Sequence, residues 1–137
     1  MLIDSNILIY AVNEDSPKHK LSQKFLHYNR GKLSLSHQNI LEAIRVLTHP
    51  KYSQPMNPKL AVDAVLSIAG ASRIIIPNNM TQYIATEFIK LFKLAGNRIF
   101  DAYLAATALS NDINIIATDN TKDFKKFTEL KIINPFV

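Results

Sequence analysis

Four acidic residues, widely separated in the chain, have the types and positions from which a chemical site can be built: Asp4, Glu42, Asp101 and Asp119. Asp4 ends the apolar opening of the chain, and Asp119 follows the β-rich run 115–118, so both lie where a strand ends. Glu42 and Asp101 lie near the starts of predicted helices. In a fold that alternates strands and helices, strand carboxyl ends and neighbouring helix amino ends share one side of the sheet. We therefore expect the four carboxylates to converge there.

Carboxylates gathered at one place repel one another. Like charges a few ångströms apart raise each other's pKa, and an unpaired buried carboxylate is unfavourable. A bound divalent cation resolves that conflict, and hard cations such as Mg²⁺ prefer oxygen ligands. The chain has no cysteine, which excludes zinc–thiolate and disulfide chemistry and favours a metal held by oxygen. The sequence thus predicts a divalent-metal site.

Each acid also has a purely structural explanation. Asp4 could cap a helix that starts just after it, since Asp is a frequent N-cap. Glu42 falls on the polar side of its helix and could pair with Arg45, a contact worth only a few tenths of a kcal/mol. Asp119 fits a turn, and an acid shortly after it could decorate the first turn of a helix. Asp101 is the hardest to explain in this way, because its surroundings are apolar nearly all round.

The elements that must position these acids alternate along the chain. β-rich runs predict strands at about 2–4, 33–36, 74–77, 113–118 and 132–134. Helical patterns lie between them, at about 6–10, from 17 onward, and at 38–49, 59–68, 81–94 and 98–110. Ser16, before Pro17, and Ser36 are predicted N-caps, and the proline-rich segment 48–58 is predicted to be a loop. Short apolar strands joined by helices indicate an α/β fold with a parallel sheet covered on both faces.

Composition limits the classes of protein. With 137 residues, of which 47% are apolar, the chain is expected to form one domain over 1–137, because it is short for two ordinary cores. The first strand starts at residue 2 and no apolar run reaches membrane-spanning length, so we expect a cytoplasmic protein. A net charge of +5 is compatible with a polyanionic partner such as nucleic acid. Lysines that could meet phosphates, or simply form a solvated helix face, are Lys122, Lys125 and Lys126.

Together and in order, several segments resemble the PIN-domain family over essentially the full length of the chain. These segments are 2–6, 39–42, 100–106, 117–119 and 123–124. The resemblance is closest to the ribonuclease toxins of type II toxin–antitoxin pairs, the VapC kind. It implies a three-layer α/β/α sandwich with a central parallel sheet in strand order 3-2-1-4-5. It further implies Mg²⁺ or Mn²⁺ as cofactor, RNA as substrate, a homodimer, and a small antitoxin protein as partner.

The resemblance also implies roles for individual residues. The catalytic acids are Asp4, Glu42, Asp101 and Asp119. Of these, Asp4 and Asp101 would hold the metal, Asp119 would complete or share its site, and Glu42 would orient a water or a second ion. Residues that would hydrogen-bond the carboxylates or the substrate are Ser5, Asn6, Thr118 and Asp123, with Asn120 as an alternative to Asp123. Phosphodiester hydrolysis needs an acidified water and neutralised phosphate oxygens, and a divalent ion supplies both.

Other classes of protein fit less well. A haloacid-dehalogenase-type phosphatase would need an Asp two residues after Asp4, where this chain has Asn6. A receiver-like signalling domain would need an acidic pair before its central Asp and a late lysine at a strand end, and neither is found. Only three glycines are present, which argues against a P-loop or dinucleotide site. A non-catalytic PIN scaffold, and an RNA-processing nuclease outside a toxin system, remain as alternatives.

Overall fold

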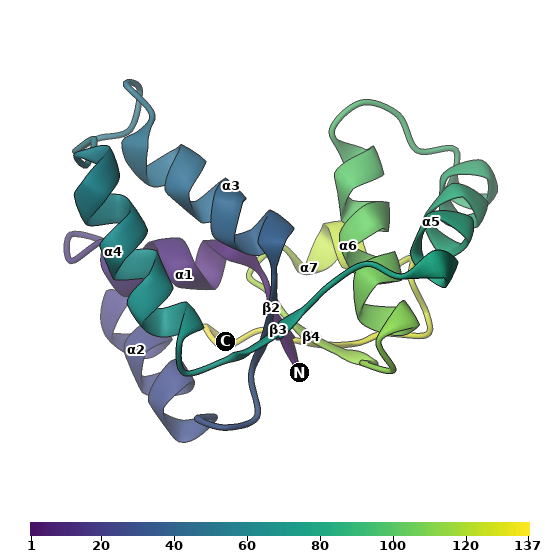
Figure 1. Cartoon of the computed structure of the whole chain (residues 1–137), viewed down its shortest axis with the longest axis horizontal. Coiled ribbons are helices and arrows are strands. Elements are labelled where there is room, and N and C mark those ends of the chain that lie inside the picture. The colour runs from purple at the N-terminus through teal and green to yellow at the C-terminus, as the bar shows by residue number, and fades with distance from the viewer.

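The computed structural model describes all 137 residues, which form a parallel sheet between two layers of helices (Figure 1). The strands are β1 (Leu2–Ile3), β2 (Ser34–Ser36), β3 (Arg73–Ile75), β4 (Ile115–Ala117) and β5 (Lys131–Ile133). The helices are α1 (Ser5–Val12), α2 (His19–Tyr28), α3 (His37–Thr48), α4 (Pro58–Ala69), α5 (Asn79–Phe92), α6 (Arg98–Ser110) and α7 (Thr121–Phe124). None of them is long and apolar enough to cross a membrane. The strand order is β3-β2-β1-β4-β5, so the predicted sandwich and its order are confirmed.

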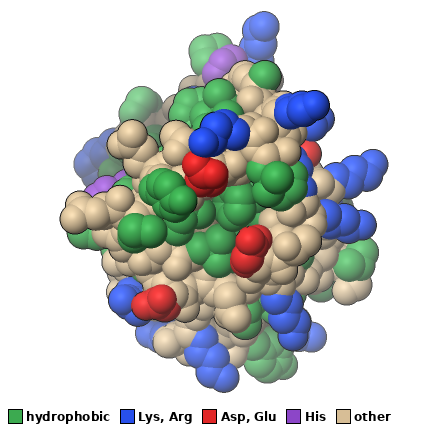
Figure 2. Space-filling model, turned by 90° about the vertical axis from the view of Figure 1, so that its right-hand side faces the viewer, with side chains coloured by type: hydrophobic (Ala, Val, Ile, Leu, Met, Phe, Trp, Pro, Cys, Tyr) green, Lys and Arg blue, Asp and Glu red, His purple; other side chains and the backbone are tan.

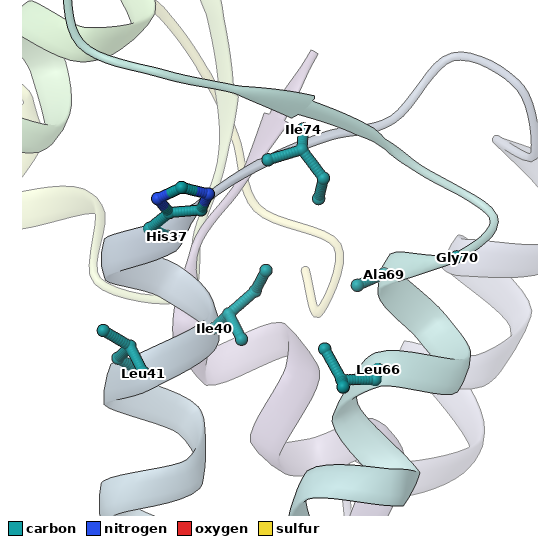
Figure 3. A pocket seen from close by; sticks show the side chains of 7 residues that line it. All are labelled: His37, Ile40, Leu41, Leu66, Ala69, Gly70 and Ile74. Carbon is teal, nitrogen blue, oxygen red and sulfur yellow. The ribbon is translucent and has the colours of Figure 1, made fainter.

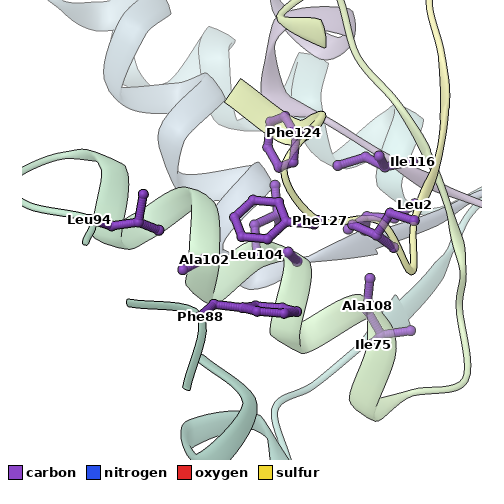
Figure 4. Packing of buried hydrophobic residues seen from close by; sticks show 12 residues of the cluster. Leu2, Ile75, Phe88, Leu94, Ala102, Leu104, Ala108, Ile116, Phe124 and Phe127 are labelled. Carbon is purple, nitrogen blue, oxygen red and sulfur yellow. The ribbon is translucent and has the colours of Figure 1, made fainter. Parts of the chain in front are cut away.

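Two apolar cores fill the space on either side of the sheet. Helices α1 to α4 lie on one side and α5 to α7 on the other (Figure 1). Because successive strand residues point to opposite faces, Leu2 belongs to the core under α5 and α6, and Ile3 to the core under α1 to α4. Aromatic rings dominate the first of these cores, where Phe88 and Phe127 lie with their ring centroids 4.8 Å apart (Figure 4). The sheet is therefore buried on both faces.

The centre of the sheet is where its topology reverses. Strand β1 pairs with β2 on one side and with β4 on the other, and all neighbouring strands are parallel. The N–H of Asp4 donates to the carbonyl of Ala117 at 2.9 Å, which aligns the carboxyl ends of β1 and β4. Ligands of open α/β sheets bind outside the strand carboxyl ends at such a reversal. The acids at the ends of β1 and β4 lie at this position.

Local signals predicted some helix ends and missed others. Ser36 caps α3 as expected, and the Asn39 side chain completes a capping box with it. The predicted cap at Ser16 is wrong, because α2 begins only at His19 and its N-cap, Lys18, makes no side-chain capping bond. Instead the Ser16 hydroxyl accepts from the N–H of Lys18 at 3.2 Å and closes a turn. The Lys18 side chain is thereby left to contact another part of the chain.

Smaller differences concern element boundaries. Helix α4 begins at Pro58 because the side chain of Asn57 accepts from a first-turn N–H, and α5 begins two residues earlier than predicted because Asn78 caps it. The four-residue helix α7 was not predicted as a separate element. Each strand has two or three residues, which is shorter than several of the predicted runs. None of these differences moves an acid from the predicted edge of the sheet.

Candidate active site

Asp4 is a buried carboxylate that combines two roles. It is the N-cap of α1 and accepts from the N–H of Ser5 at 2.7 Å, so the structural explanation holds. It also accepts from the hydroxyl of Thr118, 114 residues away, at 2.7 Å. Burial raises the pKa of Asp4, the bonds from Thr118 and Ser5 oppose that shift, and the charge of Glu42 adds to it. Capping therefore places Asp4 among the other acids and does not replace a chemical role.

Asn6 and Thr118 tie the ends of β1 and β4 together around Asp4. The amide of Asn6 donates to Oδ2 of Asp4 at 3.1 Å and to the hydroxyl of Thr118 at 3.2 Å. The side-chain Oδ1 of Asn6 accepts from the backbone N–H of Asp119 at 3.4 Å. Thr118 is fully buried, so its hydroxyl is held in place by these contacts. Asn6 and Thr118 therefore both donate hydrogen bonds to the Asp4 carboxylate.

Glu42 points from α3 towards α1. Its Oε2 accepts from the hydroxyl of Ser5 at 3.2 Å, and its Oε1 accepts from the side-chain amide of Gln38 at 2.9 Å. Gln38 also donates to the carbonyl of Phe100 at 3.1 Å, which links α3 to the first turn of α6. The ion pair with Arg45 that the sequence allowed is absent: neither Glu42 nor Arg45 takes part in any ion pair of the structure. Its carboxylate is thus directed to the site and not to a surface cation.

Asp101 lies in the first turn of α6 and is half-buried. No hydrogen bond or ion pair from the protein holds its carboxylate. Burial raises its pKa to about 6, together with the negative charges of Asp123, Asp4 and Glu42, while Lys126 opposes the shift. The apolar surroundings expected from the sequence are present in the middle of α6, where residues 104–108 are all buried, but not throughout its first turn, where Phe100 is 56% exposed. Asp101 is the acid with the least compensation from the protein.

Asp119 follows β4. Its carboxylate is held by Tyr10 of α1 and by Lys18, which lies in the turn between α1 and α2. Its Oδ2 forms an ion pair with Lys18 and accepts from the hydroxyl of Tyr10 at 3.0 Å. Partial burial on its own raises the pKa of Asp119, but the bonds from Lys18 and Tyr10 outweigh it, so the pKa is lowered. Burial, followed by this contact with Asp119, raises the pKa of Tyr10 to about 12. Asp119 is therefore ionised and fixed.

Two further polar residues lie beside the fourth acid. The sequence left open whether Asn120 or Asp123 assists the fourth acid. In the structure the amide of Asn120 donates to Oδ2 of Asp123, so the two side chains lie together. Asp123 raises the pKa of Asp101, which shows that its charge is felt across the site. Lys126 acts on Asp101 with the opposite sign. Lys122 and Lys125 are exposed.

The oxygen-rich donor set suits a hard divalent cation such as Mg²⁺ or Mn²⁺. No three Asp, Glu or His side chains lie close enough together to form a complete ligand set in this conformation. In this conformation the Glu42 carboxylate accepts from Ser5, and the Asp119 carboxylate pairs with Lys18. No donor holds the Asp101 carboxylate, and burial and the neighbouring acids raise its pKa. A cation beside Asp101 would relieve that repulsion, so the residues fit the ion that the sequence predicted.

Sequence reasoning missed Lys18, Tyr10 and Gln38. Nothing in the local sequence connects Lys18 to an acid 101 positions later, because only the folded topology brings them together. The ring of Tyr10 packs edge to face against Phe136, and nothing in the sequence indicated that its hydroxyl would reach Asp119. Gln38 could have been found, because it lies four residues before Glu42 and so on the same side of the helix.

The largest cavity lies away from the acids. It is an open, mainly apolar groove of about 510 Å³ between α3, α4 and β3, and its lining residues are His37, Ile40, Leu41, Leu66, Ala69, Gly70 and Ile74 (Figure 3). The side chains of Leu41 and Leu66 are 64% and 48% exposed. No carboxylate lines this groove, so it has no means of holding a metal ion. Its chemistry suits an apolar partner surface.

Comparisons with known proteins agree with this geometry. The PIN domain family model matches residues 1–130. The ribonuclease VapC37 of Mycobacterium tuberculosis is 24% identical over 140 residues, covering 98% of this chain and 96% of that protein. The structure of VapBC-1 from nontypeable Haemophilus influenzae aligns with a TM-score of 0.74 at 19% identity, over 99% and 98% of the two chains. A toxin–antitoxin complex from Klebsiella pneumoniae aligns with a TM-score of 0.64 at 21% identity, over 98% and 97%.

Proposed function

Because the chain belongs to the PIN domain family, we propose that residues 1–137 form a divalent-metal-dependent endoribonuclease, the toxin of a type II toxin–antitoxin pair. The observation that carries this proposal is the half-buried Asp101 carboxylate, which has no partner in the protein and is raised in pKa by the acids around it. The full-length similarity to a protein named as a ribonuclease supports RNA as the substrate. A cytoplasmic location, where such a substrate is found, is part of the same proposal.

The proposed metal ligands are Asp4 and Asp101, with Asp119 completing or sharing the site. When bound, Mg²⁺ or Mn²⁺ would acidify a water and neutralise phosphate oxygens. Thr118 and Asn6 keep the oxygens of Asp4 in a fixed orientation, which is the usual task of groups behind metal ligands. Glu42, held by Ser5 and Gln38, is placed to orient the attacking water. Asp123 adds negative charge and Lys126 positive charge at the edge of the site.

The experiment that tests this function is cleavage of an end-labelled single-stranded RNA by the purified chain. We expect internal cuts in Mn²⁺ or Mg²⁺ and none in excess EDTA, because the carboxylates alone cannot neutralise the phosphate. Full restoration by Mn²⁺ after EDTA treatment shows that the chelator has not unfolded the protein. Equal cleavage with and without EDTA would contradict metal dependence. Binding of Mn²⁺ without any cleavage would favour the non-catalytic scaffold.

We also propose a homodimer built from helix faces. On the side of the molecule that carries α5 and α6, hydrophobic side chains gather in the middle with Asp or Glu side chains among them, and Lys and Arg side chains lie mostly around them (Figure 2). The exposed apolar residues of these two helices are Met80, Tyr83, Leu91, Ile99, Phe100 and Tyr103. Exposed apolar side chains gathered on one face in this way are typical of a protein–protein contact.

Light scattering at tens of micromolar is expected to give twice the 15.5 kDa mass of one chain. Leu91 is 70% exposed on this apolar face, so a charge placed there would be buried in the dimer contact. A Leu91→Glu variant should therefore give the mass of a single chain. A Gln82→Glu variant adds the same charge to α5 away from the apolar residues and should remain dimeric. A monomeric wild-type protein at this concentration would contradict the dimer.

The proposed protein partner is a small antitoxin. The structurally similar Klebsiella pneumoniae assembly is a toxin–antitoxin complex, which supports this class of partner. The apolar groove lined by Leu41, Leu66 and Ile74 offers a place where apolar side chains of such a partner could be buried. Basic side chains of the same partner would complement the carboxylates of the acidic site.

A further inference from the structure

Lys18 is the only Lys or Arg side chain that forms an ion pair with any of the four acids. Its ammonium group contacts Oδ2 of Asp119, and the two side chains are 37% and 20% exposed. The remaining ion pairs of the structure, Lys59 with Asp63 and Lys90 with Glu87, lie on exposed helix surfaces. Lys18 thus supplies the one positive charge that directly contacts a carboxylate of the acidic site, whereas Lys126 acts on Asp101 without forming an ion pair.

Two aromatic rings fix the position of this charge. The Lys18 ammonium lies 5.2 Å from the ring centroids of both Tyr10 and Phe136, a range in which cations are attracted to aromatic faces. The two rings pack edge to face with centroids 5.4 Å apart. The hydroxyl of Tyr10 donates to the same Oδ2 of Asp119 that Lys18 contacts. The ammonium is therefore confined between two rings and one carboxylate oxygen.

The backbone near Lys18 is held as well. The N–H of Lys18 donates to the hydroxyl of Ser16 at 3.2 Å, and a ring nitrogen of His19 lies 3.0 Å from the carbonyl oxygen of Tyr10. These contacts join the turn before α2 to α1, the helix that carries Tyr10. A long, flexible lysine side chain loses entropy when it is fixed, so holding it at both ends is consistent with a definite task.

That task follows from electrostatics. Nucleases that use two metal ions place them about 3.5 to 4 Å apart, each bound to shared carboxylates. A second divalent ion at Asp119 would have to bind a carboxylate whose Oδ2 already holds an ammonium and a hydroxyl donor, even if the ion contacted Oδ1. Two cations on one carboxylate repel each other strongly, because Coulomb energies rise steeply at such separations.

We propose that Lys18 is the built-in second cation of the acidic site, so that the site takes one divalent ion, at Asp4 and Asp101, and admits no second ion at Asp119. This inference rests on the proposed function and makes it more specific. Lys18 supplies positive charge at the same edge of the sheet where the metal-bound phosphate would lie. Its ammonium, on Oδ2 of Asp119, repels any further cation that approaches this carboxylate.

The test is the number of Mn²⁺ ions bound by the full chain, measured by calorimetric titration and by the EPR signal of free Mn²⁺. Wild type is expected to bind one ion. A Lys18→Met variant keeps an aliphatic stem between the two rings but lacks the charge, and is expected to bind two. A Lys18→Arg variant keeps the charge and should bind one. The double variant Lys18→Met with Asp119→Asn should return to one, because the second ion would need the Asp119 carboxylate.

Two ions in the wild-type protein, or one ion in a folded Lys18→Met variant, would overturn the inference. Circular dichroism reports whether the variant folds, and Lys18→Gln, which also removes the charge, provides a second chance to see the additional ion. The titration is separable from the nuclease assay. One ion in wild type and two in Lys18→Met, without RNA cleavage by either, would contradict the nuclease and support the role of Lys18. Two ions in an active wild-type enzyme would contradict the role of Lys18 alone.

Discussion

An Asp101→Asn variant is expected to lose at least about 100-fold in the rate of RNA cleavage while remaining folded. The metal contributes several kcal/mol of charge stabilisation, and each 1.4 kcal/mol corresponds to a factor of ten in rate. The amide of Asn removes the charge that holds the ion but preserves the shape of the side chain. Cleavage of an end-labelled RNA under single-turnover conditions measures the effect.

The same variant should be more stable than wild type in metal-free buffer. The folded pKa of Asp101, about 6, lies above the ordinary value for an aspartate, 3.8. The folded state thus holds this proton more tightly than the unfolded chain, so the fold loses stability as pH rises from about 4 to about 6, and the full penalty remains above pH 6. Chemical denaturation in EDTA should show a gain of about 1 to 2 kcal/mol at pH 7.5, a value reduced for screening of a half-exposed group, and none near pH 4.

Asp112→Asn is the matched control for both measurements. Asp112 is an exposed acid just after the other end of α6, and its backbone has a positive φ of 59°, which Asn tolerates well. This variant loses one carboxylate without touching the acidic site, so cleavage and pH-dependent stability should match wild type. Wild-type activity in a carefully purified Asp101→Asn protein would remove Asp101 from the site.

A single charge in the apolar groove is expected to abolish binding of the antitoxin. Leu66 lines the groove from α4, and a Leu66→Glu variant would bury an unpaired carboxylate under the partner. Such burial costs several kcal/mol, so the affinity should fall at least about 100-fold. The measurement is a calorimetric titration with the antitoxin that we expect a neighbouring gene to encode.

Ser67→Glu controls for the added charge. Ser67 is the exposed next residue on α4 and does not line the groove, so its variant should bind the antitoxin as wild type does. Both variants should cleave RNA normally when alone, because the groove contains no acid of the active site. Undiminished affinity of the Leu66→Glu variant would show that the antitoxin binds elsewhere.

The convergence of the acids was predictable from the sequence because it depends on topology. A strand that ends in an acid, in a sheet with right-handed parallel crossovers, places that acid at the carboxyl edge whatever the details of packing. Asp4 and Asp119 follow this rule directly. The sequence argument for Glu42 was weaker, because a solvated helix face explained it equally well. The direction of its side chain depends on the hydrogen bonds from the Ser5 hydroxyl and the Gln38 amide.

The contacts around Asp119 could not be predicted, for a different physical reason. The Lys18 ion pair joins positions 101 residues apart, and no periodicity or local motif encodes such a contact. The mistaken N-cap at Ser16 hid it further, because a helix starting at Pro17 would have oriented Lys18 differently. The apolar groove was also invisible, since Leu66 and Ile74 look like ordinary core residues in sequence.

Anomalous X-ray scattering from a crystal soaked with Mn²⁺ tests the central claim most directly, because it locates the ion relative to the acids. One peak is expected within about 2.3 Å of a carboxylate oxygen of Asp4 and of one from Asp101, the range of oxygen–metal contacts for hard divalent ions. Soaking a crystal of the Asp101→Asn variant in parallel should remove or greatly weaken the peak. A Mn²⁺ peak at any other part of the surface, with none at Asp4 and Asp101, would contradict the proposed active site.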